Sequence, residues 1–306
     1  MRLGIDIGGT KTAAIAMDGD GRLSEQVRMP TGFGAGAVVE TAVDIVQRVT
    51  ELSGFLLADV HSIGIGIPGA VDSRTGRVSH AVNLGVEDLA LGRALSDRLG
   101  IAVRVENDVK AAAVGAHHLF AQSGTIAGLD SMAYLNLGTG LAAGIVLGGR
   151  LLRGGHGVAG EIGHIPIDPL GVQCSCGQIG CVETLASGSA IARMWPTDAA
   201  LPARDLFDAA DAGDASALEV RERFFDGVAA AVRILVLTAD VDAVVIGGGL
   251  SALGTPLIDG VRAALDRGAA SSPFLASLGL AERMHVIPLG FPAAAVGAAL
   301  TGVDNG

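Results

Sequence analysis

Residues 2–17 read Arg-Leu-Gly-Ile-Asp-Ile-Gly-Gly-Thr-Lys-Thr-Ala-Ala-Ile-Ala-Met, two apolar runs separated by a Gly-Gly-Thr turn. Residues 132–147 read Met-Ala-Tyr-Leu-Asn-Leu-Gly-Thr-Gly-Leu-Ala-Ala-Gly-Ile-Val-Leu and have the same order. Each stretch predicts two short strands that are joined by a tight glycine turn. Two such copies predict a chain of two similar halves rather than a short-period repeat.

Helical and strand patterns fill the chain around these two copies. Apolar residues recur at helical spacing over 37–52, and residues 61–67 form a buried strand pattern. The alternation predicts an α/β protein. We expect an N-terminal α/β domain over residues 1–115, completed by the C-terminal helix at about 292–306, and a C-terminal α/β domain over residues 116–291.

Composition excludes several classes of partner. The chain has 306 residues with 32 acidic and 21 basic side chains, a net charge of −11 that argues against a nucleic-acid-binding surface. No run of about 18 uncharged apolar residues occurs, so we expect no membrane span. Asp6 interrupts the stretch that a signal peptide would need to be apolar, which predicts a cytoplasmic protein.

Three glycine turns follow predicted strands. In the first, residues 6–11, a carboxylate precedes backbone N–H groups, a hydroxyl and the ammonium of Lys11, a set that suits phosphate and Mg²⁺. A simple hairpin with a surface lysine is the alternative. The turns at 138–140 and 247–249 match neither a P-loop nor a dinucleotide fingerprint. Three strand-to-glycine turns in one chain favour phosphate binding.

A carboxylate lies between the first two turns in sequence. Glu106-Asn107-Asp108 follows a short strand and opens a helix. Asp108 could simply satisfy N–H groups at the helix start. Alternatively, it is a general base that takes a proton from a substrate hydroxyl which Asn107 orients, since phosphoryl transfer needs little else from side chains. Lys110 faces either the same cleft or solvent, and we expect solvent.

All three cysteines lie close together. With one histidine they form the series His164, Cys174, Cys176 and Cys181, the complete ligand set of a closed tetrahedral zinc site. Free buried cysteines and a disulfide are the alternatives, and a cytoplasmic setting disfavours the disulfide. Because no ligand position is left for water, we expect structural Zn²⁺.

Two glutamates, Glu161 and Glu183, flank the cysteine loop. In isolation they would be solvated surface charges. Beside a rigid metal loop they become candidate acceptors for sugar hydroxyls. His164 can serve both purposes, because one ring nitrogen binds metal while the other donates a hydrogen bond.

Taken together, these motifs resemble the ROK family (repressors, open reading frames, kinases) over nearly the whole chain. The resemblance implies the actin-like ATPase (ribonuclease H-like) fold, with two α/β domains and the active site in the cleft between them. It also implies ATP, catalytic Mg²⁺ and a small-molecule sugar as ligands, and a homodimer. The motifs are Asp6-Ile-Gly-Gly-Thr-Lys11, Glu106-Asn-Asp108, Leu137-Gly-Thr-Gly140, Gly160-Glu-Ile-Gly-His164, Cys174-Ser-Cys-Gly-Gln-Ile-Gly-Cys181-Val-Glu183 and Ile246-Gly-Gly-Gly249.

The resemblance also implies a role for individual residues. Asp6 would place Mg²⁺ and Asp108 would be the catalytic base. The phosphate site would consist of Gly8, Gly9, Thr10, Lys11, Gly138 and Thr139. The adenosine would lie against Gly247, Gly248 and Gly249. The sugar would be held by Gly69, Asn83, Asn107, Asp108, Glu161, His164 and Glu183.

The chain departs from the family pattern in three places, one of which is Ala142-Ala143 at positions that are Gly-rich in the family. Val109-Lys110 stand where family kinases often have Ala-Asn, and the segment from Asn83 to Glu87 lacks the Pro and Trp of the glucose enzymes. The departure between Asn83 and Glu87 leaves the identity of the sugar open.

We therefore predict an ATP-dependent, glucokinase-like kinase of a hexose or N-acetylhexosamine. The alternatives are a sugar-responsive regulator and a sugar-binding protein without catalysis. Because the first phosphate motif begins at residue 6, we expect no DNA-binding domain before it. Polyphosphate as the donor is disfavoured, since no basic channel signature is found.

Overall fold

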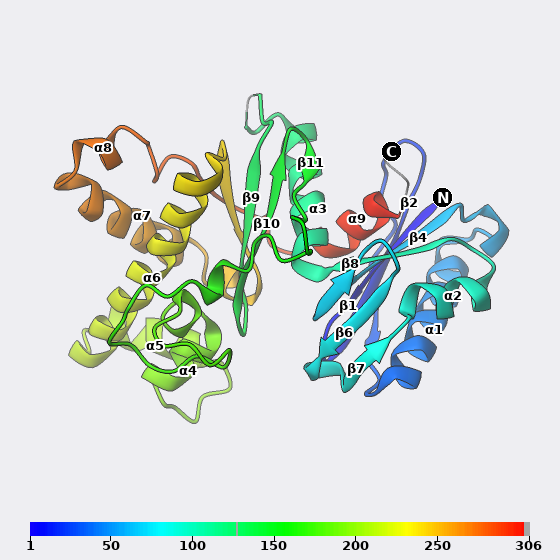
Figure 1. Ribbon diagram of the computed structural model, residues 1–306, viewed down its shortest axis with the longest axis horizontal. Helices are drawn as coiled ribbons and strands as arrows, with labels where there is room; N and C mark the ends of the chain where they lie inside the picture. Colours follow the sequence, from blue (N-terminus) through cyan, green and yellow to red (C-terminus); the bar gives the residue numbers. More distant parts are fainter. Residues whose placement is uncertain (127, 303–306) are drawn as a thin grey trace. The chain divides into compact units, whose positions relative to one another are not determined.

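The computed structural model describes residues 1–126 and 128–302 (Figure 1). Its chain forms two compact units, each with its own sheet. Unit 1 comprises residues 1–128, 149–158 and 291–306, and unit 2 comprises residues 129–148 and 159–290. The last four residues of the expected C-terminal segment, 303–306, lie outside the described residues.

Unit 1 contains a mixed sheet in the order β3-β2-β1-β4-β8 and a small antiparallel sheet in the order β5-β6-β7. Strand β1 is antiparallel to β2 and parallel to β4, which is parallel to β8. The strands of these sheets are β1 (Arg2–Ile7), β2 (Lys11–Met17), β3 (Val27–Pro30), β4 (Ser62–Ile67), β5 (Ala70–Asp72), β6 (Arg77–Ala81), β7 (Val86–Leu89) and β8 (Val103–Asn107). The short strand β11 (Arg150–Leu151), within residues 149–158, belongs to neither of these two sheets. The helices are α1 (Ala35–Ser53), α2 (Leu91–Leu99), α3 (Asp108–Ser123), α9 (Ala293–Thr301) and the 3₁₀ turns η1 (Leu57–Asp59) and η2 (Val82–Leu84).

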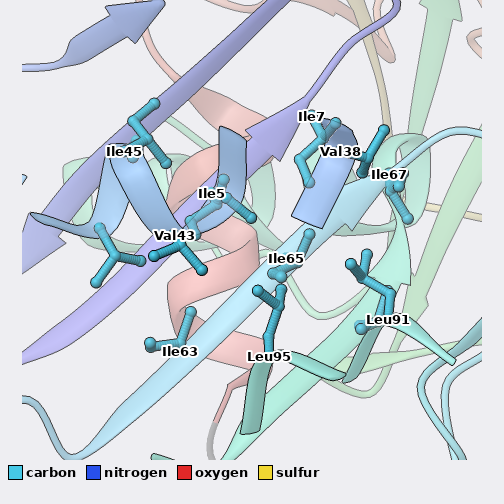
Figure 2. Close-up of a cluster of buried hydrophobic side chains, with 14 of the residues drawn as sticks. Ile5, Ile7, Val38, Val43, Ile45, Ile63, Ile65, Ile67, Leu91 and Leu95 are labelled. Atoms are coloured by element: carbon cyan, nitrogen blue, oxygen red, sulfur yellow. The ribbon is translucent and has the colours of Figure 1, made fainter. Parts of the chain in front are cut away.

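The sequence of β4, Ser-Ile-Gly-Ile-Gly-Ile, explains how helices cover both faces of this sheet. Successive side chains of a strand point to opposite faces, so the isoleucines share one face and the glycines the other. Figure 2 shows the isoleucine face, where β1 and β4 pack on side chains of α1 and α2: Ile5, Ile7, Ile63, Ile65 and Ile67 with Val38, Val43, Ile45, Leu91 and Leu95. On the other face, a Cβ at Gly64 would lie 1.7 Å from the carbonyl oxygen of Ala298. The glycines thus let the backbone of α9 approach the sheet directly.

Helices α3 and α9 also pack closely through glycine. A Cβ at Gly115 would lie 2.0 Å from the carbonyl oxygen of Ala293, and one at Gly297 would lie 1.7 Å from that of Ala111. The boundary expected after residue 115 therefore falls inside α3, at its contact with α9. Unit 1 continues to residue 128, because the whole of α3 packs with this unit.

Unit 2 contains the sheet strands β10-β9-β12-β13, in which β9 is antiparallel to β10 and parallel to β12. A hairpin beside parallel strands is also the arrangement of β2-β1-β4-β8, so the two halves are built alike. None of the described helices is long and apolar enough to span a membrane. The strands are β9 (Met132–Leu137), β10 (Leu141–Leu147), β12 (Ala243–Gly247) and β13 (Met284–Val286). The helices are α4 (Gly188–Met194), α5 (Pro202–Asp211), α6 (Ala215–Ala239), α7 (Thr255–Ala270), α8 (Pro273–Ala276) and the 3₁₀ turns η3 (Ile162–His164), η4 (Val182–Thr184) and η5 (Gly249–Leu253).

Candidate functional site

Two carboxylates meet where the parallel strands of unit 1 end. The strand register pairs Asp6 of β1 with Gly66 of β4. Because Gly66 has no side chain, α3 begins directly above it, and a Cβ there would lie 3.4 Å from the Cα of Asp108. Burial of the Asp6 carboxyl and the nearby charge of Asp108 raise the pKa of Asp6 to about 7. Such a pair of carboxylates attracts a divalent cation.

The first glycine turn lies next to this pair. The turn is closed by a hydrogen bond from the amide of Gly8 to the carbonyl oxygen of Lys11, at 2.9 Å. The Lys11 side chain is exposed. A Cβ at Gly9 would lie 3.2 Å from the Cβ of Asn83, so the turn and the η2 loop are brought together.

Asn107 is the N-cap of α3. Its side-chain oxygen accepts hydrogen bonds from the amides of Val109 and Lys110, at 3.1 and 3.2 Å. The N-cap is thus the neighbour of Asp108, and Asp108 lies in the first turn, where its own Oδ1 accepts from the amide of Val109 at 2.9 Å. The Asn107 amide nitrogen also donates to the carbonyl oxygen of Gly69, at 3.4 Å. The structure therefore brings Gly69 beside Asn107.

In unit 2, the second and third glycine turns lie at one edge of the sheet, because β9 and β12 are parallel neighbours. Gly248 has a φ of 81°, and a Cβ there would lie 2.5 Å from the carbonyl oxygen of Leu137. Its amide donates to the hydroxyl oxygen of Tyr134, at 3.2 Å. No atom of the described residues lies within 4 Å of a Cβ built at Gly249, so the backbone there is open to a ligand.

The four expected metal ligands converge. One ligand atom from each of His164, Cys174, Cys176 and Cys181 lies within 4.8 Å of all the others. The Sγ atoms of Cys176 and Cys181 are 3.7 Å apart, and the Sγ of Cys174 is 3.7 Å from Nδ1 of His164. Sulfur atoms about 2.3 Å from a central zinc ion in a tetrahedron are about 3.8 Å apart. The donor set and its spacing therefore fit Zn²⁺.

The predicted sugar-binding residues of unit 2 lie around this cluster. Glu161 immediately precedes η3, its side chain is exposed, and its carbonyl oxygen accepts from the amide of His164 at 3.2 Å. Glu183 lies in η4, which packs against η3, and its Oε2 accepts from the amide of Leu141 at 2.8 Å. With Nδ1 of His164 turned to the cysteines, Nε2 is left for a second partner.

A family model for the ROK family matches residues 2–300. The chain belongs to the ROK family. A glucokinase of Halalkalibacterium halodurans is 34% identical over 281 residues, which are 85% of this chain and 83% of that protein. An N-acetylmannosamine kinase of Salmonella arizonae is 32% identical over 285 residues, 92% of this chain and 94% of that protein.

The fold of the ROK family is also seen in the comparison of structures. A ROK family glucokinase from Streptomyces griseus, solved in complex with glucose and AMPPNP, is 31% identical with a TM-score of 0.80. The match covers 98% of each chain. The predicted fold, an actin-like ATPase of two α/β parts, is thereby confirmed.

Within this ROK protein, the sequence patterns did not indicate the surroundings of Asp108, the predicted base. Lys110, expected in solvent, is buried, and its Nζ donates to the carbonyl oxygen of Gly157 at 2.5 Å. The buried carboxylate of Glu106 accepts from Nε of Arg153 at 2.7 Å and from the amide of Asn107 at 3.0 Å. Gly157 lies 47 residues from Lys110, and Arg153 lies 47 residues from Glu106, so no local pattern could have indicated these two contacts.

Proposed function

We propose that this protein is an ATP- and Mg²⁺-dependent sugar kinase that transfers the γ-phosphoryl group to a hydroxyl of a hexose or an N-acetylhexosamine. The observation that carries the proposal is the pairing of Asp6 and Asp108 above Gly66, at the end of the parallel strands. One carboxylate would hold the cation and the other would serve as a base. Phosphoryl transfer requires this combination of charge neutralisation and proton acceptance.

Asp108 is the proposed general base. A carboxylate within hydrogen-bond reach of the acceptor hydroxyl takes its proton as the oxygen attacks phosphorus, a contribution of about 10²–10⁴-fold. Asn107 is already fixed by its capping bonds and by its contact with Gly69. It would therefore orient the same hydroxyl at little further entropic cost.

The nucleotide would be held by backbone groups of the three glycine turns, with Lys11 adding a positive charge. Glycine N–H groups approach phosphate oxygens closely and need no basic surface, which agrees with a net charge of −11. Mg²⁺ would bind at Asp6 and neutralise phosphate charge. The open backbone at Gly249, with Gly247 and Gly248, would face the adenosine.

The proposed sugar-binding groups are hydroxyl acceptors and donors. In unit 1 these are Gly69, Asn83 and Asn107, and in unit 2 they are Glu161, His164 and Glu183. Zn²⁺ at the Cys₃His cluster would fix the loop that carries the unit 2 group, without taking part in the chemistry. Elemental analysis of freshly purified protein tests the zinc assignment.

ADP release with Mg-ATP against a panel of sugars tests the proposal. The panel contains glucose, mannose, fructose, allose, N-acetylglucosamine and N-acetylmannosamine. We expect sugar-dependent ADP release that falls at least about 10²-fold in Asp108→Asn, while calorimetry shows sugar binding largely retained. Turnover near wild type in this variant would refute the base assignment. Absence of ADP release across the panel, with tight sugar binding, would favour a sugar-sensing role.

The homodimer and the cytoplasmic location stay predictions. Light scattering coupled to size-exclusion chromatography tests the first, and cell fractionation tests the second.

A further inference from the structure

One segment of unit 2, residues 181–189, holds the Gly138–Gly140 turn in place. It does so through one side-chain acceptor and two backbone donors. The hydrogen bonds run from the amide of Leu141 to Oε2 of Glu183 (2.8 Å), from the amide of Gly188 to the carbonyl oxygen of Gly138 (2.8 Å), and from the amide of Ser189 to the carbonyl oxygen of Thr139 (3.1 Å). Both ends of the turn are therefore fixed by the same short stretch of chain.

The carboxylate of Glu183 is lodged against the turn itself. A Cβ at Gly140 would lie 2.5 Å from Oε2 of Glu183, so a side chain at this position would displace the carboxylate. A hydrogen bond to an ionised acceptor is stronger than a neutral one. Displacement of Glu183 thus removes both a strong bond and a packing contact from the turn.

The other end of the segment is a predicted metal ligand. Cys181 is fully buried, and its Sγ lies in the Cys/His cluster. Its carbonyl oxygen accepts from the hydroxyl of Thr184 at 2.7 Å, and Arg193 donates to the carbonyl oxygen of Thr184. Only Val182 separates Cys181 from Glu183 in the chain, so the position of the thiolate sets the position of the carboxylate.

We propose that Glu183 is a positioning residue for the phosphate turn, and that the segment 181–189 couples the Cys/His cluster to nucleotide binding. Loss of the metal therefore weakens nucleotide binding even when no sugar is present. This inference rests on the proposed kinase function, and it extends the part of Glu183 beyond the sugar hydroxyls.

Calorimetric titration with Mg-AMPPNP, without sugar, tests the role of Glu183 on zinc-loaded protein. We expect Glu183→Ala to raise the Kd about fivefold or more, since it removes a charge-assisted bond. Glu183→Gln keeps an oxygen acceptor for the Leu141 amide but not its charge, so its Kd should lie between those of wild type and Glu183→Ala. Glu219→Ala, which removes an exposed glutamate of α6, is the matched control and should not change the Kd.

Amide hydrogen exchange gives a second readout that needs neither nucleotide nor turnover. Chelation of the metal should speed exchange at Leu141, Gly188 and Ser189, and added Zn²⁺ should reverse the change. Chelation should also raise the Kd for Mg-AMPPNP. Unchanged exchange and affinity after chelation, or an unchanged Kd in folded Glu183→Ala, would overturn this inference alone. Zinc-loaded wild type that binds no nucleotide would overturn the kinase proposal together with it.

Discussion

The ammonium group of Lys110 donates a hydrogen bond to the carbonyl oxygen of Gly157, with Nζ and O 2.5 Å apart, in the interior of unit 1. A second bond from the segment that contains Gly157, residues 149–158, joins Arg153 to the buried carboxylate of Glu106. Residues 149–158 are thus attached at two points to the junction of β8 and α3, where Asp108 lies. The segment stabilises the local structure that presents the proposed base.

Replacement of Lys110 by alanine should therefore destabilise the protein. The variant leaves the Gly157 carbonyl without its donor and a void around it, a loss of about 1–3 kcal/mol in the free energy of unfolding. Lys11→Ala, which changes the only other lysine of the chain, is a matched control because that side chain is exposed. Urea unfolding measures both variants. Equal stability of the two would contradict a structural role for Lys110.

Asp6 should make the metal-free protein less stable as the pH rises. Its pKa is raised to about 7 by burial and by Asp108, whereas an aspartate of an unfolded chain titrates near about 3.9. The folded state thus holds the proton more tightly, so stability falls from about pH 4 and levels off above about pH 7. Asp6→Asn removes this effect and should raise the Tm more at pH 8 than at pH 5.

Thermal scans of chelator-treated Asp6→Asn and wild type at the two pH values provide the measurement. Asp20→Asn, a change at an exposed turn, is the control and should behave as wild type at both. A gain in Tm that is equal at pH 5 and pH 8 would show that Asp6 is not the titrating group.

Metal removal should expose one reactive cysteine. In the metal-free cluster, hydrogen bonds from Gln178 lower the pKa of Cys176 to about 6, while burial raises the pKa of Cys181 to about 12. The thiolate is the nucleophile, so chelator-treated protein at pH 7 should react with iodoacetamide first at Cys176. Bound Zn²⁺ should protect it.

Peptide mass spectrometry after brief labelling identifies the modified cysteine. Gln178→Ala should slow the reaction, because the Gln178 amide no longer donates to Cys176 Sγ, a contact of 3.4 Å. First labelling at Cys174 or Cys181 would disagree with this assignment.

Local sequence patterns predicted those parts of the site that are local in the chain. The cysteines and His164 lie within 18 residues, and their spacing alone indicated that they converge, as the structure has it. The meeting of Asp6 and Asp108 was expected only through the family resemblance. The bond from Leu141 to Glu183 joins residues 42 positions apart, and the sequence carried no signal for it.

The positions of helices and strands were likewise predictable only where the local sequence pattern is clear. The helical pattern over 37–52 and the strand pattern over 61–67 correspond to α1 and β4, because burial imposes the pattern. Strand β3 begins only at Val27, since only Val27–Pro30 pairs with β2 along its length. Polar residues at 24–26 interrupt the apolar alternation there.

The glycines of β4 provide a last prediction, because their function depends on a helix far away in the sequence. A Cβ at Gly64 would lie 1.7 Å from the carbonyl oxygen of Ala298, so Gly64→Ala must push α9 off the sheet. Overpacking of this kind typically costs about 1–3 kcal/mol, and backbone that cannot yield raises the cost. We expect Gly64→Ala to lower the free energy of unfolding by an amount at the upper end of that range or beyond. Gly36→Ala in the first turn of α1 is the matched control, because its added Cβ has no neighbour within 4 Å among residues 1–126 and 128–302 and alanine favours the helix. Denaturant titration should rank the proteins Gly36→Ala, wild type, Gly64→Ala in falling stability. A Gly64→Ala variant as stable as wild type would mean that α9 does not lie on this face of the sheet.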